Sequence, residues 1–461
     1  MIKFGTDGWR AIIGEDFNER NVELVTLAIG KYVADNFGLD KQIILGYDPR
    51  NMANVYAKQC ADILSEKGFI VTLSSKVVPT PVLAYNALFR NACAIMFTAS
   101  HNPPEYLGMK FIPDYAGPAT SEITDEIVAN IGKEFVGGVK KMKTNTADFS
   151  SAYFEHIKTI IDFKKIKDLK SSIIFDGLYS ASIGYLDKIL KNNGIKFDSI
   201  HMQHDSNFGG LMPDPKPKYL ASLIDAVNEK GDSIGISTDG DADRFGVIDE
   251  SGFYVSPDVI IAILLKYLIK KGYKGKVVKT VGSSILIDEF AKKLGIEVIE
   301  TAVGFKHIGN AMRNNRVIIG GEESGGLSIY GHIPEKDGLL ANLLLLEAIA
   351  DSGETLETLH QQIYEFIGCK FYTNRHDFKK TDSEEINKLI NLFKGVKQIG
   401  EYEVTDVNLT DGVKLMLGDK AKVLVRPSGT EPLLRVYFEA DNRNKLKQIE
   451  DAIDDLIEKN S

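Results

Sequence analysis

The segment Phe97-Thr98-Ala99-Ser100-His101-Asn102-Pro103 is the part of this chain that decides the fold. It follows the apolar run 92–96, which has the character of a buried strand. Pro103-Pro104 prevents a helix from starting there, so a loop is predicted. Ser100 and His101 therefore lie at the carboxyl end of a strand, where open α/β sheets place their chemistry. An ordinary strand-to-loop turn is the simpler interpretation of this segment taken alone.

Three later loops of the same kind make chemistry the better interpretation. They are Asp239-Gly-Asp-Ala-Asp-Arg244, Gly321-Glu-Glu-Ser-Gly-Gly326 and Arg426-Pro-Ser-Gly-Thr-Glu-Pro432. Together with the serine segment, and in this order, these loops resemble the α-D-phosphohexomutase family, and within it the phosphoglucomutases and phosphomannomutases. The resemblance extends from Phe4 to about Glu439, which is nearly the whole chain.

The order of the predicted elements indicates the fold class. Strands and helices alternate through most of the chain, which predicts three consecutive α/β domains with mixed, largely parallel sheets. Short strands with two helices at the end predict a C-terminal α+β domain with an antiparallel sheet. Each of the four loops falls in a different domain, so we expect the domains to surround one central cleft. The predicted domains are 1–145, 146–250, 251–368 and 369–461.

Bulk composition limits the class of protein. The 461 residues are 44% hydrophobic and 26% charged, as in soluble globular proteins. A net charge of −9 argues against a broad nucleic-acid surface. No apolar run is long enough to span a membrane, and the first residues lack the apolar centre of a signal peptide. Three scattered cysteines fit reduced thiols. We therefore expect a cytoplasmic protein with a small-molecule partner, present as a monomer or weak homodimer.

The acidic loop predicts a metal site. Asp239, Asp241 and Asp243 alternate in an extended backbone, so their carboxylates point the same way and suit Mg²⁺. An EF-hand loop would use the same three residues with Glu250, but Arg244 stands where that loop needs glycine. An aspartyl-nucleophile phosphatase also has an Asp-x-Asp pair after a strand, although the third aspartate is unusual there. A solvated acidic turn remains an alternative.

Other residues predict groups for an anion and for sugar hydroxyls. Lys110, on the next predicted strand after Ser100, could act as an acid/base if neighbouring cations lower its pKa. Lys306 and His307 begin a helix that could bind an anion. Glu322 and Ser324 could bind sugar hydroxyls, although paired carboxylates are also found in glycosidases. Solvated side chains on ordinary turns and helix starts would explain each of these residues separately.

The last loop predicts a phosphate cradle. Arg426 supplies a guanidinium, Ser428 and Thr430 supply hydroxyls, and Gly429 allows successive backbone N–H groups to point at one anion. A hairpin turn with a surface arginine is the alternative. The resemblance implies that this loop holds the phosphate that is not being transferred.

The resemblance implies the remaining roles. Ser100 would carry a phosphoryl group and contribute one of its oxygens to the Mg²⁺ site. Lys110, with His101 and Arg10, would handle the proton, and Arg244 and Lys336 would contact substrate. A hexose 1-phosphate and a hexose 6-phosphate would interconvert through a hexose 1,6-bisphosphate, which also serves as activator.

The sugar is predicted from the third loop and the run that follows it. The run His332-Ile-Pro-Glu-Lys-Asp-Gly338 resembles phosphoglucomutases. Phosphoglucosamine mutases typically have Gln and His where this chain has Glu323 and Gly326, so we expect glucose, with mannose also possible. Phosphoglucosamine or phosphopentose mutases, a sugar phosphatase and a non-catalytic sugar-phosphate sensor are the alternatives.

Overall fold

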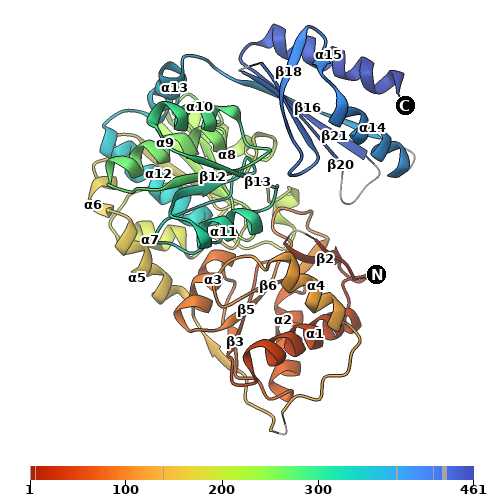
Figure 1. Ribbon diagram of the computed structural model, residues 1–461. Helices are drawn as coiled ribbons and strands as arrows, with labels where there is room; N and C mark the ends of the chain where they lie inside the picture. Colours follow the sequence, from red (N-terminus) through yellow and green to blue (C-terminus); the bar gives the residue numbers. More distant parts are fainter. Residues whose placement is uncertain are drawn as a thin grey trace. The chain divides into compact units, whose positions relative to one another are not determined.

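The structure is a computed structural model that describes residues 2–5, 7–138, 140–379, 383–418, 420–427 and 433–460 (Figure 1). The chain forms two compact units. One consists of Met1–Lys274 with Gly304–His360, and the other of Gly275–Val303 with Gln361–Ser461. In the described residues, no helix combines the length and the apolar character needed to cross a membrane.

The first sheet of the larger unit is mixed, as predicted. Its strand order is β1-β2-β6-β5-β3-β4-β7. Strands β3, β4, β5 and β7 pair in parallel, whereas β1, β2 and β6 join the edge in antiparallel pairs. The strands are β1 (Phe4–Gly5), β2 (Gly8–Ile12), β3 (Ile43–Tyr47), β4 (Val71–Ser74), β5 (Cys93–Phe97), β6 (Tyr106–Ile112) and β7 (Asn145–Ala147).

Side-chain alternation along β3 explains the layers around this sheet. Ile43 and Leu45 join the core formed with α1 and α2. A side chain at Gly46 would instead collide with Leu83 of α3, which covers the opposite face. Figure 1 shows α3 on the other side of the sheet from α1 and α2. The helices are α1 (Glu19–Phe37), α2 (Ala53–Glu66), α3 (Thr80–Phe89) and α4 (Ser121–Asn130).

The second sheet presents the acidic loop. Its order is β11-β10-β8-β9, with β8 parallel to β9 and β10 and with β11 antiparallel to β10. Thr238 pairs with Phe245, so residues 239–244 form the β10–β11 connection. The elements are β8 (Ser172–Asp176), β9 (Asp198–Ile200), β10 (Ser233–Thr238), β11 (Phe245–Ile248), α5 (Ser150–Ile160), α6 (Phe163–Ile166), α7 (Leu186–Asn192), α8 (Ala221–Lys230) and the 3₁₀ turns η1 (Phe208–Gly210) and η2 (Pro217–Tyr219).

The third loop is also a strand connection. Gly321 pairs with Leu327 in an antiparallel β14–β15 pair, so residues 322–326 form the turn. Asp337 caps the helix α12, which is almost wholly buried. The elements of this region are α9 (Pro257–Lys270), α11 (Phe305–Asn314), β14 (Val317–Gly321), β15 (Leu327–Ile329), α12 (Gly338–Ser352) and α13 (Leu356–Ile367).

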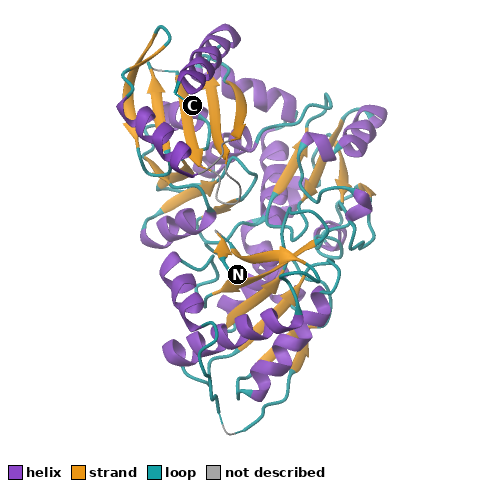
Figure 2. Ribbon diagram, turned by 90° about the vertical axis from the view of Figure 1, so that its right-hand side faces the viewer, coloured by secondary structure: helices purple, strands orange, loops and turns teal. Residues whose placement is uncertain are grey.

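The second unit contains a parallel pair, β12 (Lys276–Thr280) with β13 (Val298–Thr301), the helix α10 (Ile285–Leu294), and the C-terminal sheet. That sheet is antiparallel throughout its described pairs, in the order β16-β21-β20-β19-β18-β17, which confirms the prediction. Helices α14 (Ser383–Gly395) and α15 (Arg443–Lys459) pack on one face of it (Figure 2). Its strands are β16 (Tyr372–Lys379), β17 (Gln398–Ile399), β18 (Tyr402–Asn408), β19 (Val413–Leu417), β20 (Ala421–Pro427) and β21 (Leu433–Ala440).

Candidate active site

Ser100 lies where the sequence predicts, in the loop that leaves β5. Its side chain is buried, and its Oγ donates a hydrogen bond of 2.7 Å to Asp239 Oδ2. His101 Nδ1 is 3.5 Å from the same Oγ. The serine backbone has φ +52°, in the left-handed region that a residue with a Cβ rarely adopts. The structure therefore places the predicted nucleophile against the predicted metal loop.

The metal loop approaches the serine loop so closely that one of its residues must be glycine. A Cβ on Gly240 would lie 2.6 Å from the carbonyl oxygen of Ser100. Gly8 is in a similar position at the start of β2, because a Cβ there would lie 2.4 Å from the carbonyl oxygen of Met109. These two glycines allow backbone-to-backbone contact between the metal loop and the serine loop and between the start of β2 and β6.

The three aspartates form a compact acidic cluster. Asp239, Asp241 and Asp243 are fully buried, and one carboxylate oxygen from each lies within 4.8 Å of the others. Among the described residues, no hydrogen-bond donor reaches Asp241 Oδ1 or Asp243 Oδ1. Burial, followed by repulsion from the neighbouring aspartates, raises the pKa of Asp239 and of Asp241. A cluster of unpartnered hard oxygens that resists ionisation fits a divalent cation such as Mg²⁺.

Two lysines oppose this negative charge. Lys336 Nζ lies 3.0 Å from Asp243 Oδ2 and 3.5 Å from Asp7 Oδ2. Lys110 Nζ lies 2.9 Å from Glu335 Oε2, 3.0 Å from Asp7 Oδ1 and 3.8 Å from Asp243 Oδ2. The buried ion pairs thus extend from the metal cluster to the N-terminal loop.

Lys110 differs from its predicted electrostatic state. The prediction required cations to lower its pKa. Burial acts in that direction, but the carboxylates of Asp7 and Glu335 outweigh it and hold the pKa of Lys110 above its ordinary range. The pKa of Glu335 is also raised, to about 7, but here burial is the cause and it outweighs the adjacent lysines. Lys110 is therefore a fixed positive charge in this arrangement.

Arg10 and His101 lie beside the serine. Arg10 Nη1 donates to Asn102 Oδ1 at 2.7 Å, and Arg10 Nη2 is 3.5 Å from Asp7 Oδ2. Burial, followed by repulsion from Arg244 and Arg10, lowers the pKa of His101 well below 6.5. The imidazole is consequently neutral near pH 7.

The third loop joins the metal loop through the backbone. Phe245 N donates to the carbonyl oxygen of Gly325 at 2.9 Å. Glu322 is buried, with its Oε1 accepting from Gly304 N at 3.1 Å and its Oε2 accepting from Ser324 Oγ at 3.0 Å. Burial raises the pKa of Glu322. A buried carboxylate and a hydroxyl are suitable partners for sugar hydroxyls.

Of the other predicted ligands, Arg244 contacts the acidic cluster directly, whereas the contacts of Lys306 and His307 are with other segments. Lys306 Nζ donates to Ser121 Oγ at 3.0 Å, at the start of α4. His307 is on the first turn of α11, and its backbone N–H donates to the carbonyl oxygen of Gly304. Arg244 donates its backbone N–H to Asp239 Oδ1 at 3.0 Å. Their assignment to substrate remains a prediction.

The phosphate cradle is described only in part. In the second unit, Arg426 forms an ion pair of 2.8 Å with Asp411. Ser428, Gly429 and Thr430 lie outside the described residues. The role of this loop remains a prediction.

Sequence reasoning missed four side chains that the structure places around the predicted ones. Asp7 and Glu335 flank Lys110, and Thr80 Oγ1 donates to Asp241 Oδ2 at 2.6 Å. Arg50 donates to the carbonyl oxygen of Ser100 at 2.7 Å. Asp7 and Glu335 stand next to motif residues that were recognised, and Arg50 ends a loop at the predicted catalytic edge. The positions of these three residues in the sequence were the signal that could have identified them.

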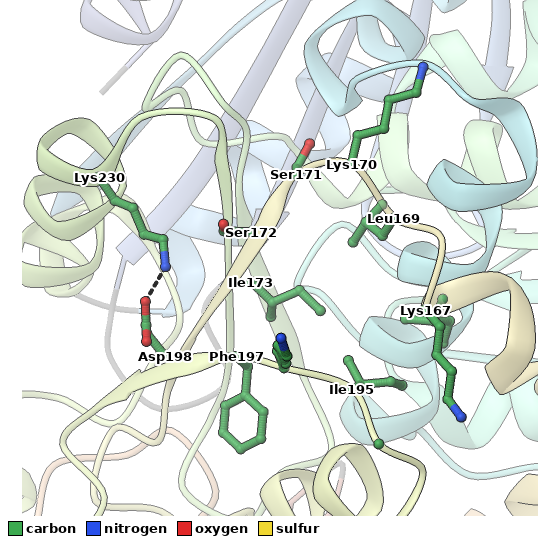
Figure 3. Close-up of a pocket in the computed structure, with 13 residues that line it drawn as sticks. Lys167, Leu169, Lys170, Ser171, Ser172, Ile173, Ile195, Phe197, Asp198 and Lys230 are labelled. Carbon is green, nitrogen blue, oxygen red and sulfur yellow. Dashed lines mark hydrogen bonds and ion pairs between the residues drawn. The ribbon is translucent and has the colours of Figure 1, made fainter.

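A surface cavity of about 510 Å³ lies elsewhere on the second sheet (Figure 3). It is lined by the first residues of β8 and by residues around β9, whereas the acidic loop follows the last residue of β10. The ammonium groups of Lys167, Lys170 and Lys230 point in different directions, and Lys230 is paired with Asp198. This cavity shares no residue with the predicted site.

Comparisons with known proteins cover nearly the whole chain. The phosphoglucomutase/phosphomannomutase family matches it through alpha/beta/alpha domain I (residues 1–136), domain II (151–252), domain III (256–366) and the C-terminal domain (380–456). The phosphoglucosamine mutase of Methanocaldococcus jannaschii is 32% identical over 459 residues, covering 97% of this chain and 96% of that protein. A phosphoglucomutase/phosphomannomutase of Thermococcus kodakarensis is 28% identical, with 96% of each chain covered.

A solved structure agrees with the whole fold. The crystal structure of a phosphomannomutase candidate from Thermus thermophilus has a TM-score of 0.88 and 30% identity, with 99% of each chain covered. The predicted fold class, three α/β domains followed by an α+β domain, is confirmed by these matches.

Proposed function

The chain belongs to the phosphoglucomutase/phosphomannomutase family of phosphohexomutases, and we propose that it interconverts glucose 1-phosphate and glucose 6-phosphate. The reaction would pass through a phosphorylated Ser100 and glucose 1,6-bisphosphate. The observation that carries this proposal is the hydrogen bond of 2.7 Å from Ser100 Oγ to Asp239, inside a cluster of three buried aspartates.

The acidic cluster supports a Mg²⁺ requirement. Asp239, Asp241 and Asp243 would hold the ion, together with one oxygen of the phosphoryl group on Ser100. When bound, Mg²⁺ offsets the negative charge of the phosphoryl group as it moves. The unpartnered oxygens of Asp241 and Asp243 are consistent with such a ligand set.

The proposed transfer uses the chain's own groups in a defined way. The P–O bond to Ser100 breaks while a bond forms to the free O1 or O6 hydroxyl of the sugar phosphate. The hydroxyl proton must leave, and His101, 3.5 Å from the Ser100 hydroxyl, and Glu335, which is paired with Lys110 beside the metal cluster, are titratable groups that could accept it. After the bisphosphate reverses its orientation in the site, the reverse transfer returns its other phosphoryl group to Ser100.

The third loop supports recognition of sugar hydroxyls. Ser324 Oγ donates to Glu322, and Glu322 also accepts from the backbone N–H of Gly304, the N-cap of α11, so the orientation of this carboxylate is set before substrate binds. A ligand with two hydroxyl groups can donate a hydrogen bond to Glu322 in place of the Ser324 hydroxyl. Such a pair tolerates the two opposite orientations that a mutase substrate must adopt.

A second candidate substrate is glucosamine phosphate. The relatives of 30–32% identity that carry a functional name include phosphoglucosamine mutases from Methanocaldococcus and Methanococcus. The names of these relatives are what supports the amino sugar, whereas Glu323 stands where phosphoglucosamine mutases typically have Gln and supports glucose.

The test is a set of parallel initial-rate assays with Mg²⁺ and a trace of the matching bisphosphate. The 1-phosphates of glucose, mannose and glucosamine are compared for wild type and Ser100→Ala. We expect the highest kcat/KM for glucose, with all activity lost in the variant. A higher kcat/KM for glucosamine would reassign the sugar, and full activity in Ser100→Ala would overturn the mechanism.

A further inference from the structure

Arg50 lies directly beneath the serine loop. Its side chain is fully buried, and its guanidinium donates four hydrogen bonds to backbone carbonyl oxygens of that loop. Nη2 reaches the oxygens of Ser100 and Asn102, both at 2.7 Å. Nη1 reaches those of Pro103 at 2.7 Å and Tyr106 at 3.0 Å. One side chain therefore fixes the path of the loop from the serine itself to the start of β6.

Asp48 and Thr98 complete this arrangement. Asp48 Oδ2 accepts from Arg50 Nε at 3.2 Å and from the Thr98 hydroxyl at 2.6 Å. Thr98 Oγ1 in turn accepts from the backbone N–H of Ser100 at 2.8 Å. We call Asp48, Arg50 and Thr98 the serine clamp, because they hold both the N–H and the C=O of Ser100.

The conformation that the clamp holds is unfavourable by itself. Ser100 has φ +52°, and a non-glycine residue keeps such a conformation only when its surroundings determine it. In this conformation Oγ lies 2.7 Å from Asp239. A return of the serine to an extended backbone would redirect its side chain relative to the metal loop.

An aromatic ring from the second α/β domain covers the clamp. The guanidinium carbon of Arg50 lies 5.0 Å from the ring centre of Phe208, which is buried at the start of η1. The ring excludes water from the hydrogen bonds and favours the planar cation stacked on it. The clamp therefore connects the serine loop to the domain that carries the aspartates.

We propose that Arg50 is a positioning residue for phosphoryl transfer, acting through the serine clamp to keep Ser100 Oγ aimed at the metal cluster. The inference rests on the proposed mutase function. Arg50 touches only backbone carbonyls, Asp48 and Phe208 in these contacts, so its effect on the reaction passes through the position of Ser100.

The matched change is Arg50→Lys, with Arg90→Lys as control. A lysine keeps the charge but has one donor atom in place of the planar fork, so it cannot serve all four carbonyls between Ser100 and Tyr106. Arg90 is an exposed arginine at the end of α3 that also stacks on a phenylalanine, Phe149, at 5.2 Å. Among the described residues, none of the contacts of Arg90 reaches the serine loop.

We expect Arg50→Lys to lower kcat by roughly tenfold to a hundredfold, because small misplacements of reacting groups have effects of this size. The KM for glucose 1-phosphate should change by less than about threefold, because the sugar loop is untouched. Inorganic phosphate released per turnover should rise, because a misaligned phosphoserine loses its phosphoryl group to water, which supplies the oxygen and the protons. A purely structural role would not produce that leak.

Thr98→Val provides a second variant, in which a methyl group replaces the hydroxyl and both of its hydrogen bonds are lost. It should also lower kcat with little change in KM. If Arg50→Lys does not fold, this variant alone tests the role of the serine clamp. Wild-type values of kcat and phosphate release in folded Thr98→Val or Arg50→Lys would overturn the clamp. A wild-type protein that lacks mutase activity would instead overturn the proposed function, so the two failures are distinguishable.

Discussion

At the scale of single residues, the site holds several carboxylates and ammonium groups close together and away from water. Three buried aspartates face two buried lysines, Asp7 pairs with both lysines, and Glu335 pairs with Lys110. Burial and mutual repulsion raise the pKa of Asp239 and Asp241, so a bound cation would be strongly favoured there. The buried carboxylates and ammonium groups thus surround a single hydroxyl group, that of Ser100.

Replacing one of these carboxylates should therefore lower the activity without lowering the stability. We expect Asp239→Asn to lower Mg²⁺-dependent turnover by roughly a hundredfold or more, because changes next to metal ligands alone cost about 10- to 100-fold. Its thermal unfolding midpoint in EDTA should be no lower than that of wild type, since one source of repulsion is removed. Rates against Mg²⁺ concentration and circular dichroism measure both effects. Unchanged turnover, with exposed Asp62→Asn as reference, would contradict the metal assignment.

The residues that the sequence predicted are those whose geometry is local. Asp239, Asp241 and Asp243 alternate within one short loop, so their common direction follows from extended backbone alone. The charge state of Lys110 could not be predicted in this way, because it depends on Glu335, which is 225 positions away in the chain. Long-range partners of this kind leave no periodic signal.

At the scale of elements, regular patterns were predicted well and the connections between elements were not. The apolar spacing in residues 19–37 predicts a helix, and α1 spans Glu19–Phe37. The metal loop was placed between two strands and the third loop at the end of one, but the hydrogen bond from Phe245 to Gly325 that joins them could not be anticipated. It depends on the pairing of two sheets that are far apart in sequence.

Helix α3 holds the metal loop at its first residue. Thr80 donates its N–H to the carbonyl oxygen of Asp241 at 2.9 Å and its hydroxyl to Asp241 Oδ2 at 2.6 Å. We expect Thr80→Val to raise the Mg²⁺ concentration needed for half-maximal activity by about 10- to 100-fold, because the carboxylate loses its orienting donor. Thr80→Ser should stay close to wild type. Equal Mg²⁺ requirements for the valine and serine variants would contradict this role.

Helix α5 contributes a pH-sensitive contact. His156 Nε2 lies 2.9 Å from His332 Nδ1, and His332 Nε2 lies 2.9 Å from Asp337, the cap of α12. Burial, with repulsion from His332, lowers the pKa of His156 from 6.5 to about 4. In the unfolded chain the His156 imidazole is protonated below about pH 6.5, whereas in the folded protein it is protonated only below about pH 4.

The free energy of unfolding should consequently fall as the pH drops through this interval. We expect His156→Asn to have a shallower dependence, because asparagine keeps a polar side chain without the titration. Urea midpoints measured at several pH values between about 4 and 7 test this. An equal slope in both proteins would show that His156 does not contribute.

At the scale of the whole molecule, the proposed metal ligands all belong to one of the two compact units. Ser100 and the three aspartates lie in the unit formed by Met1–Lys274 and Gly304–His360. A ligand that binds only the folded state stabilises it by about 2.7 kcal/mol at 100 times its Kd. Mg²⁺ should therefore protect this unit selectively.

Hydrogen exchange followed by mass spectrometry tests that expectation. Adding Mg²⁺ in place of EDTA should slow exchange in peptides around β5, β10 and the metal loop. Peptides from β16–β21 in the second unit should exchange at the same rate in both conditions. Protection that is confined to the second unit would place the metal elsewhere.

The central claim is that Ser100 carries the phosphoryl group in transit. The most direct measurement is to incubate the protein with glucose 1,6-bisphosphate and Mg²⁺, and then to map phosphorylation by peptide mass spectrometry. The account predicts one phosphoryl group on Ser100, which is lost to sugar when excess glucose 1-phosphate is added and is absent in Asp239→Asn. A protein that turns over sugar phosphate while Ser100 never becomes phosphorylated would contradict it.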